Sequence, residues 1–239
     1  MLQFSACQSS LFFTLYVRKF FKYVQAPVVH RLNLNQIKVE YVISFSDALF
    51  AFSITFMALS IQIPTFSSNI ADSELTKRLG QLLIPNIIHY VVSFMVVGMY
   101  WISYHRIFEH IRRADITLVW INLLFLLFIA LVGYFTGLLT TYDTHRIVVV
   151  SFSGIMAATG FVLCLIWGYA SYNRRLVDGD MPDHLIRYFL HRSFVTPLIF
   201  LTSIGISYIN IETAQYFWVM ILPANLIIYM KHIPHLHRP

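Results

Sequence analysis

Six long apolar stretches constrain this chain more than any other feature of its sequence. A helix needs roughly 20 apolar residues to cross the hydrocarbon core of a bilayer, and each stretch is long enough or nearly so. Short polar segments separate them, which predicts an all-α, polytopic membrane protein with six transmembrane helices. The stretches cover residues 41–63, 83–102 (continuing as helix to 112), 116–139, 147–170, 190–211 and 213–230, with a tight external turn at 210–212.

Composition excludes a soluble protein. Hydrophobic residues make up 58% of the 239 residues and charged residues only 12%, about half the charge of an ordinary soluble domain. The two cysteines, Cys7 and Cys164, are far apart in sequence, so no disulfide framework or cysteine metal site is expected. No motif of a nucleotide-binding or hydrolytic enzyme is present, so we expect no enzyme, no metal site and no cofactor.

Basic residues orient the chain in the membrane. If the N-terminus is cytoplasmic, 14 of the 17 Lys and Arg residues fall in cytoplasmic segments, and Lys77, Arg78 and Arg146 fall outside. Cytoplasmic loops carry an excess of Lys and Arg, so both termini are predicted to be cytoplasmic in a multi-pass protein of the cell membrane. The net charge of +6 is thereby explained without a nucleic-acid partner, and the expected surroundings are a lipid bilayer.

The sequence divides into three regions. Residues 1–37 are predicted to form an amphipathic segment, cytoplasmic or on the membrane surface, because Arg18, Lys19 and Lys22 follow the apolar run at 11–21. A signal peptide has its positive charges before the apolar run. Residues 38–232 form the predicted six-helix domain, and residues 233–239 form a short cytoplasmic tail.

One acidic residue, Asp47, lies within the first apolar stretch. Intramembrane charges are costly and serve a function or a buried pairing. Asp47 lies seven residues after Glu40, His105 seven residues before Arg112, and Asn122 seven residues after Asp115. At 1.5 Å per residue all three lie about 10 Å from the cytoplasmic ends of their helices. We predict one buried polar cluster joining three helices, formed by Ser46, Asp47, Trp101, His105 and Asn122.

Asp47 also has a functional interpretation, in which it lines an ion or proton path. An uncharged face of the same helix argues for the structural one. At 100° per residue, Asp47 points about 140° away from Phe52. If the uncharged face lines a pore, Asp47 is turned toward neighbouring helices. That face carries, at heptad spacing, Tyr41, Phe45, Ala48, Phe52, Thr55 and Leu59.

Three sequence blocks together resemble a known family. They are Phe45-Ser46-Asp47 near the start of the first helix, Trp101-x-x-x-His105 in the second, and Arg113-x-Asp115-x₆-Asn122 leading into the third. At this spacing they resemble the six-helix prokaryotic members of the transmembrane protein 175 family of potassium channels. The resemblance covers about residues 38–232.

The resemblance implies a homotetramer in which four first helices surround one pore with an apolar constriction. Carried onto this chain, Phe52, Thr55 and Leu59 line the pore, and the Phe45-Ser46-Asp47 motif packs against the second and third helices. The expected function is passive permeation of potassium, with other monovalent cations as further candidates. Two departures bear on conduction: Tyr41 replaces the arginine that begins the family motif, and Phe52 replaces the Ile or Leu of the narrow ring.

Two other functions stay open from the residues themselves. A proton-coupled secondary transporter would use Asp47 and His105, although transporters commonly show internal repeats and none is evident here. A non-conducting membrane scaffold would use neither. Flux through liposomes that contain the purified protein separates the scaffold from the other two.

Overall fold

The computed structural model describes residues 37–59, 71–225 and 227, and the described part is a bundle of long helices. The bounds are α2 Val39–Leu59, α3 Asp72–Phe108, α4 Ile116–Tyr142, α5 Arg146–Ser171 and α6 Asp183–Ser207, followed by the short α7 Ile211–Phe217. Single 3₁₀ turns, η3 Tyr172–Arg174 and η4 Trp218–Met220, follow α5 and α7. Isolated bridges join Ile37 to Ala114 and Ile111 to Val177.

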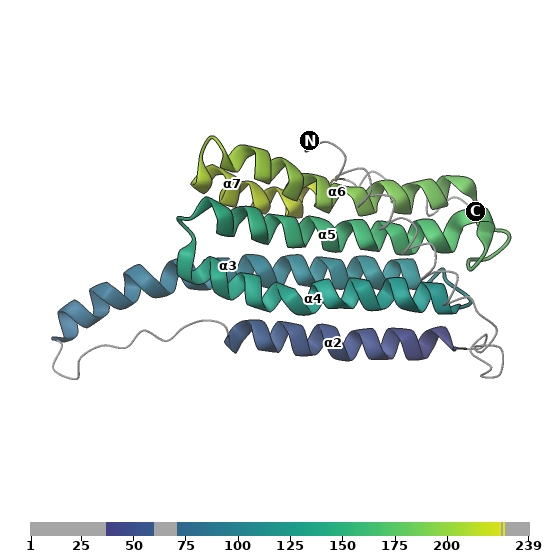
Figure 1. Cartoon of the computed structure of the whole chain (residues 1–239), viewed down its shortest axis with the longest axis horizontal. Helices are drawn as coiled ribbons and strands as arrows, with labels where there is room; N and C mark the ends of the chain where they lie inside the picture. Colours follow the sequence, from purple (N-terminus) through teal and green to yellow (C-terminus); the bar gives the residue numbers. More distant parts are fainter. Residues whose placement is uncertain (1–36, 60–70, 226, 228–239) are drawn as a thin grey trace, which may run out of the picture.

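The helices lie side by side in layers (Figure 1). α2 forms one edge, α3 and α4 come next, α5 follows, and α6 with α7 forms the opposite edge. α5 has its most extensive contacts with α6 and α4, whereas α2 packs mainly on α4 and α3. Five of these helices are long and apolar enough to cross a membrane. The prediction of an all-helical, multi-pass membrane protein is therefore confirmed for the described residues.

Several predicted boundaries were wrong. α3 does not continue to Arg112 but ends at Phe108, because the chain turns at 109–110 and pairs Ile111 with Val177. It also begins at Asp72, eleven residues before the predicted span. α6 runs 183–207 where 190–211 was predicted, because the turn starts at Tyr208 and Asn210 caps α7 by accepting a hydrogen bond from the Thr213 amide.

The predicted sixth span is only partly described. α7 and η4 form its beginning, helix continues over 221–225, and residues 228–230 lie outside the described part. Most of the predicted 1–37 segment and the whole 233–239 tail also lie outside it.

α3 is long enough to do more than span a bilayer. Its 37 residues extend about 55 Å at 1.5 Å per residue, against a hydrocarbon core of about 30 Å. Figure 1 shows the N-terminal part of α3 projecting beyond the other helices. Only the C-terminal part of α3 packs within the bundle, so residues near its end, such as Trp101 and His105, are the ones that reach α2.

Candidate functional site: a polar clamp behind an uncharged helix face

α2 has one buried face and one exposed face. The buried face carries Val39, Val42, Ser46, Phe50, Ser53 and Met57, which recur every three or four residues as a helix packed on one side requires. On the opposite face, apolar side chains that would normally be buried remain uncovered. They include Tyr41, Phe45, Phe52, Phe56 and Leu59. In a single subunit, α2 thus presents a continuous uncharged surface on the outside of the bundle.

The three predicted pore-lining residues all lie on this exposed face. Phe52 is 65% exposed and Leu59 is 76% exposed, and Thr55 is also exposed. The Thr55 hydroxyl donates to the Ala51 carbonyl at 2.9 Å, which leaves its oxygen able to accept or coordinate. The Phe52 ring stacks on Phe56, with centroids 5.8 Å apart. A second body packed against this face would meet aromatic and aliphatic side chains and the hydroxyls of Tyr41 and Thr55, with no charge.

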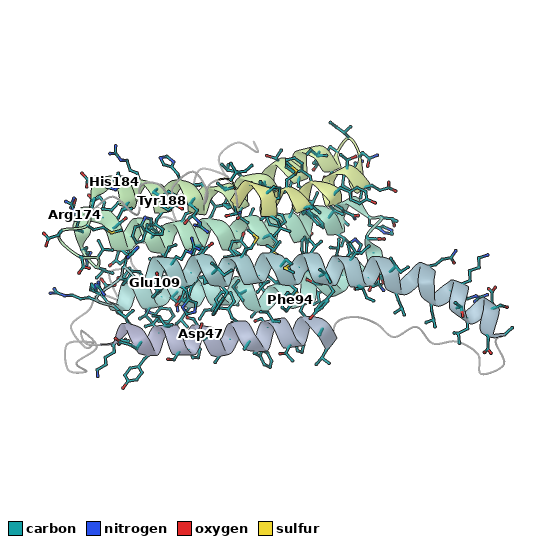
Figure 2. All side chains as sticks on the ribbon, turned by 180° about the vertical axis from the view of Figure 1, so that it is seen from behind. Asp47, Phe94, Glu109, Arg174, His184 and Tyr188 are labelled. Carbon is teal, nitrogen blue, oxygen red and sulfur yellow. The ribbon has the colours of Figure 1, made fainter. Side chains whose placement is uncertain are left out.

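Asp47 is turned toward α3, where two side chains bind one of its oxygens. Trp101 donates its indole Nε1–H to Asp47 Oδ1 at 2.8 Å, and His105 Nε2 lies 2.7 Å from the same atom. Trp101 and His105 are one turn apart, so their rings also meet edge to face at 4.6 Å between centroids. Figure 2 shows Asp47 on α2, further from the end of the bundle that carries Glu109 and Arg174. These contacts fix the rotation of α2 relative to α3.

Ser46, next to Asp47, makes a second set of contacts that is fully buried. Its hydroxyl lies 2.7 Å from the Tyr104 hydroxyl and accepts from the Asn122 amide Nδ2 at 3.1 Å. Tyr104 is buried and stacks between Phe108 and Phe125. Ser46 thereby joins α2 to both α3 and α4 inside an apolar core, while the Asn122 side-chain oxygen Oδ1 is buried without a hydrogen-bond partner among the described residues.

The polar cluster therefore differs from the single buried group that the sequence predicts. The structure has two connected groups, and only the one around Ser46 is buried. The side chain of Asp47 is 41% exposed and that of His105 29% exposed, while Phe45 points outward and joins neither group. Sequence reasoning missed Tyr104 altogether. We call the two groups together (Ser46, Asp47, Trp101, Tyr104, His105, Asn122) the α2 clamp.

α4 supports α2 along the whole contact. Ser46 meets Asn122 near the start of both helices, and eleven residues further along each chain Met57 meets Gly133. The two helices therefore run parallel and in register. A Cβ atom at Gly133 would lie 3.4 Å from the Phe56 ring and 3.7 Å from the Met57 backbone. The glycine thus lets the backbones approach closely, as small residues do between membrane helices.

The loops at the clamp end are tied together by charges. Asp115, the N-cap of α4, accepts from the Leu118 amide at 2.8 Å and from the Tyr169 hydroxyl at 2.6 Å. Arg175 lies 3.4 Å from the same carboxylate, and Arg112 pairs with Asp178 at 2.8 Å. Sequence reasoning used Asp115 as a depth marker and as part of the Arg113-x-Asp115-x₆-Asn122 block, without a structural role. Its position just before an apolar run is a recognisable N-cap signal that identifies its role.

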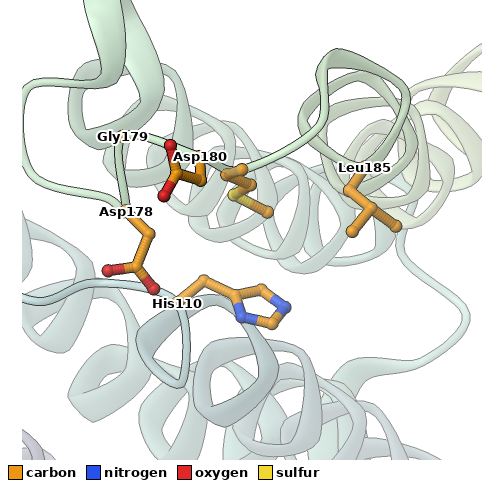
Figure 3. A pocket seen from close by; sticks show the side chains of 6 residues that line it. His110, Asp178, Gly179, Asp180 and Leu185 are labelled. Carbon is orange, nitrogen blue, oxygen red and sulfur yellow. The ribbon is translucent and has the colours of Figure 1, made fainter.

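A cavity of about 320 Å³ opens between these loops (Figure 3). His110, Asp178 and Asp180 contribute the titratable groups, with Met181 and Leu185 completing the wall. The His110 ring packs edge to face on Phe189, 4.9 Å between centroids. No group of three or more metal-ligating side chains occurs among the residues that the structure covers. Burial is the largest influence on His110 and lowers its pKa, while the Glu109 and Asp178 carboxylates act in the opposite direction.

This lowered pKa predicts a small loss of stability in acid. Because folded His110 resists protonation, the unfolded chain takes up the proton first as pH falls below about 6.5, and the free energy of unfolding decreases. Between pH 7.5 and 5.5 the melting temperature of wild type should fall more than that of His110→Gln. The exposed His184 provides the control, since His184→Gln should retain the wild-type pH dependence. Equal pH dependence in wild type and His110→Gln would contradict the assignment.

Comparison with known proteins identifies relatives of this chain. The family described as "Endosomal/lysosomal potassium channel TMEM175" matches residues 41–132, the segment that contains the whole α2 clamp. A protein of Streptomyces collinus named as a potassium channel is 27% identical over 70% of this chain and 81% of its own length. One of Chamaesiphon minutus, also named as a potassium channel, is 26% identical over 70% of this chain and 83% of its own length.

An animal protein and a protein of known structure are also similar to this chain. The mouse protein named "Endosomal/lysosomal proton channel TMEM175" is 27% identical over 64% of this chain but only 30% of its own length. A crystal structure of a lysosomal potassium-selective channel TMEM175 homologue from Chamaesiphon minutus superposes with a TM-score of 0.68 at 23% identity, covering 82% of this chain and 98% of that one. The fold seen here is therefore that of the solved homologue.

Proposed function

We propose, from the premise that this chain is a relative of the TMEM175 proteins, that it forms a passive potassium-permeable cation channel. Several copies would place the uncharged face of α2 around one pore, with Phe52, Thr55 and Leu59 lining it. The observation that carries this proposal is the division of α2 into two faces. Its one intramembrane carboxylate is bound by α3, while an uncharged row of side chains remains uncovered.

The names of the relatives support the choice of ion. Bacterial relatives that share more than four-fifths of their length with this chain are named as potassium channels. In the proposed pore, potassium sheds part of its hydration shell at the apolar ring, and the Thr55 hydroxyls supply replacement oxygens. Apolar constrictions also gate by dewetting. A pore without rings of backbone carbonyls should select potassium over sodium only moderately.

The uncovered face also supports assembly from identical subunits. One chain has one α2, so a symmetric pore needs several copies around an axis, and we propose a homotetramer in the cell membrane with both termini cytoplasmic. The clamp end of the bundle carries Arg112, Arg174 and Arg175, as the cytoplasmic side of a membrane protein should.

Single-channel recording in planar bilayers tests the proposed pore. Leu59→Ala should raise the unitary potassium current several-fold, because it removes a side chain from the apolar throat. Thr55→Ala should change the potassium-to-sodium permeability ratio with a smaller effect on current. Leu165→Ala, which shortens an exposed leucine on α5, is the matched control and should leave both quantities at wild-type values. If neither α2 variant differs from wild type, this face does not line the pore.

Proton movement is a second candidate, favoured by the 2.7 Å contact between His105 and Asp47 and by the name of the mouse relative. In that case the two side chains would exchange a proton during transport. The Asp47 variants described in the Discussion separate this candidate from the channel with a structural clamp.

A further inference from the structure

Two buried hydroxyls behind the proposed pore-lining helix have no hydrogen-bond partner among the described residues. They belong to Ser53 on α2 and Thr136 on α4, which are 5% and 0% exposed. Serine and threonine inside a helix often donate to a carbonyl of the preceding turn, as Thr55 does, but these two do not. Leaving a buried hydroxyl unpaired costs free energy, so each one needs a partner from outside the described chain.

Both hydroxyls face the seam between α2, α3 and α4, where Ser46 meets Asn122 and Tyr104. Ser53 follows Ser46 by seven residues, which is two turns less about 20° at 100° per residue. Thr136 follows Asn122 by fourteen residues, which is four turns less about 40°. Each hydroxyl therefore lies on the same face of its helix as the residue that meets the neighbouring helices in the seam.

Ser93 brings a third buried hydroxyl to the seam, from α3. It precedes Tyr104 by eleven residues, which is three turns and about 20°. Its hydroxyl donates to the His89 carbonyl at 2.8 Å, so its oxygen can still accept from another donor. Figure 1 shows α2 and α3 running in opposite directions. Met57 follows Ser46 by eleven residues, so Ser93 lies near the depth of Met57.

The spacing of the three hydroxyls suits single water molecules. Ser53 lies four residues before Met57 on α2, and Thr136 lies three residues beyond Gly133, the α4 residue that meets Met57. At 1.5 Å per residue, the offsets of these two hydroxyls from Ser93 along the bundle are about 6 Å and 4.5 Å. One water that bridges two hydroxyls spans about 5.6 Å, twice the usual O–H···O distance. Each offset is thus comparable with the reach of one water molecule.

Aromatic rings separate this part of the seam from the α2 clamp. Phe50 lies between Ser46 and Ser53 on the buried face of α2. Its ring contacts the rings of Tyr104 and Phe125, each at 5.9 Å between centroids. Those two rings stack on each other at 5.6 Å. The three unfilled hydroxyl positions therefore lie beyond the clamp, on the far side of an apolar layer.

We propose that this part of the seam binds a short row of internal water molecules, held by the hydroxyls of Ser53, Ser93 and Thr136. Buried water normally bridges polar groups that the protein leaves unpaired, with two to four partners for each molecule. α2 is then held by direct side-chain contacts at the clamp and by exchangeable water further along. This inference goes beyond the proposed function and does not depend on it, because the water lies on the face of α2 opposite the proposed pore.

Radiolytic footprinting of the full-length wild-type protein in lipid nanodiscs tests the proposal. Microsecond X-ray exposure produces hydroxyl radicals from water in place, so a buried methionine is oxidised where water lies beside it. Met57 in the seam and Met156 on α5 are 1% and 0% exposed, so their exposure predicts equal rates. With water in the seam, Met57 should be oxidised several-fold faster than Met156. Equal rates in wild type overturn the proposal.

The isosteric variant Thr136→Val provides a second readout, because valine keeps the shape of the side chain and removes its hydroxyl. If the hydroxyl binds water, the variant loses a hydrogen bond, and its melting temperature should fall by about 2–4 °C. If the hydroxyl is unpaired, valine removes an unsatisfied polar group, and the melting temperature should stay the same or rise. Either of these last two results contradicts the proposal.

A double variant connects the two readouts. Ser53→Ala combined with Thr136→Val should reduce the oxidation rate of Met57 to that of Met156. Thr202→Val is the matched control, because the Thr202 hydroxyl is exposed on α6 and donates to its own helix, and it should leave the Met57 rate at the wild-type value. Fast oxidation of Met57 in the double variant would show that these hydroxyls do not hold the water. The wild-type comparison stands even if the double variant fails to fold.

Discussion

Replacing Gly160 with alanine should lower the melting temperature of the protein by about 2–12 °C, and valine should prevent folding into a stable bundle. A Cβ atom at Gly160 would lie 2.7 Å from Pro197 Cδ and 2.9 Å from the Tyr100 hydroxyl. The proline ring is rigid, and the tyrosine is held by donating to the Met156 carbonyl at 2.6 Å. Overpacking of this kind costs about 1–3 kcal/mol, and each kcal/mol lowers the melting temperature of a chain this size by about 2–4 °C.

Gly154 provides the control on the same helix. A Cβ atom there would meet nothing within 4 Å, so Gly154→Ala should leave the melting temperature unchanged or raise it slightly, since alanine favours helix. Both variants are measured by thermal unfolding of the purified protein in detergent. Equal melting temperatures for Gly160→Ala and Gly154→Ala would mean that α5 and α6 are not packed as closely as the structure has them.

If the chain forms the proposed homotetrameric channel, replacing Asp47 with leucine should abolish its assembly. The substitution removes the single oxygen that receives Trp101 and binds His105, and hydrogen bonds to a charged group are worth about 1.5–3 kcal/mol each. Because Asp47 is partly exposed, the free energy lost with each of these hydrogen bonds should fall toward the lower end of that range. α2 should then lose its rotational position, and size-exclusion chromatography should show aggregated or dissociated subunits. Ser44→Ala, on an exposed position of the same helix whose hydroxyl bonds only to its own backbone, should assemble normally.

The variant Asp47→Asn distinguishes a structural role of Asp47 in the α2 clamp from a role in a proton path. Asparagine keeps an oxygen that accepts from Trp101 but cannot carry a proton between His105 and solvent. If Asp47 is structural, this variant should assemble and retain potassium flux in liposomes. If Asp47 moves protons, the variant should assemble and lose pH-driven flux. A variant that assembles and conducts potassium but loses proton flux would favour the proton function over the structural one.

Sequence reasoning located best the features that depend on the length of the apolar stretches and on the depth of a residue within the membrane. Counting residues from the flanking charges brought Asp47, His105 and Asn122 to a common level, and the structure joins the helices there through contacts of 2.7–3.1 Å. The uncharged face of α2 followed from heptad spacing alone. The homotetramer and the pore itself stay predictions, because a single chain cannot show what covers an exposed face.

The elements that sequence reasoning missed depend on tertiary contacts. Tyr104 has the pattern of an ordinary core aromatic, and only the position of Ser46 on another helix gives its hydroxyl a partner. The end of α3 at Phe108 is set by pairing of Ile111 with Val177, a residue more than sixty positions away. Hydropathy also missed the start of α3, because Asp72 and Glu74 occupy a first turn that is helical but too polar to count as membrane-spanning.

The attachment of α2 to its own subunit has a consequence for a subunit that lacks its proposed neighbours. An unassembled subunit leaves a carboxylate 41% exposed at a depth where the surrounding medium is lipid, together with a row of uncovered aromatic rings. The carboxylate keeps its partners Trp101 and His105 within the same subunit. In the proposed homotetramer, it is therefore the uncovered aromatic row that makes a lone subunit prone to self-association.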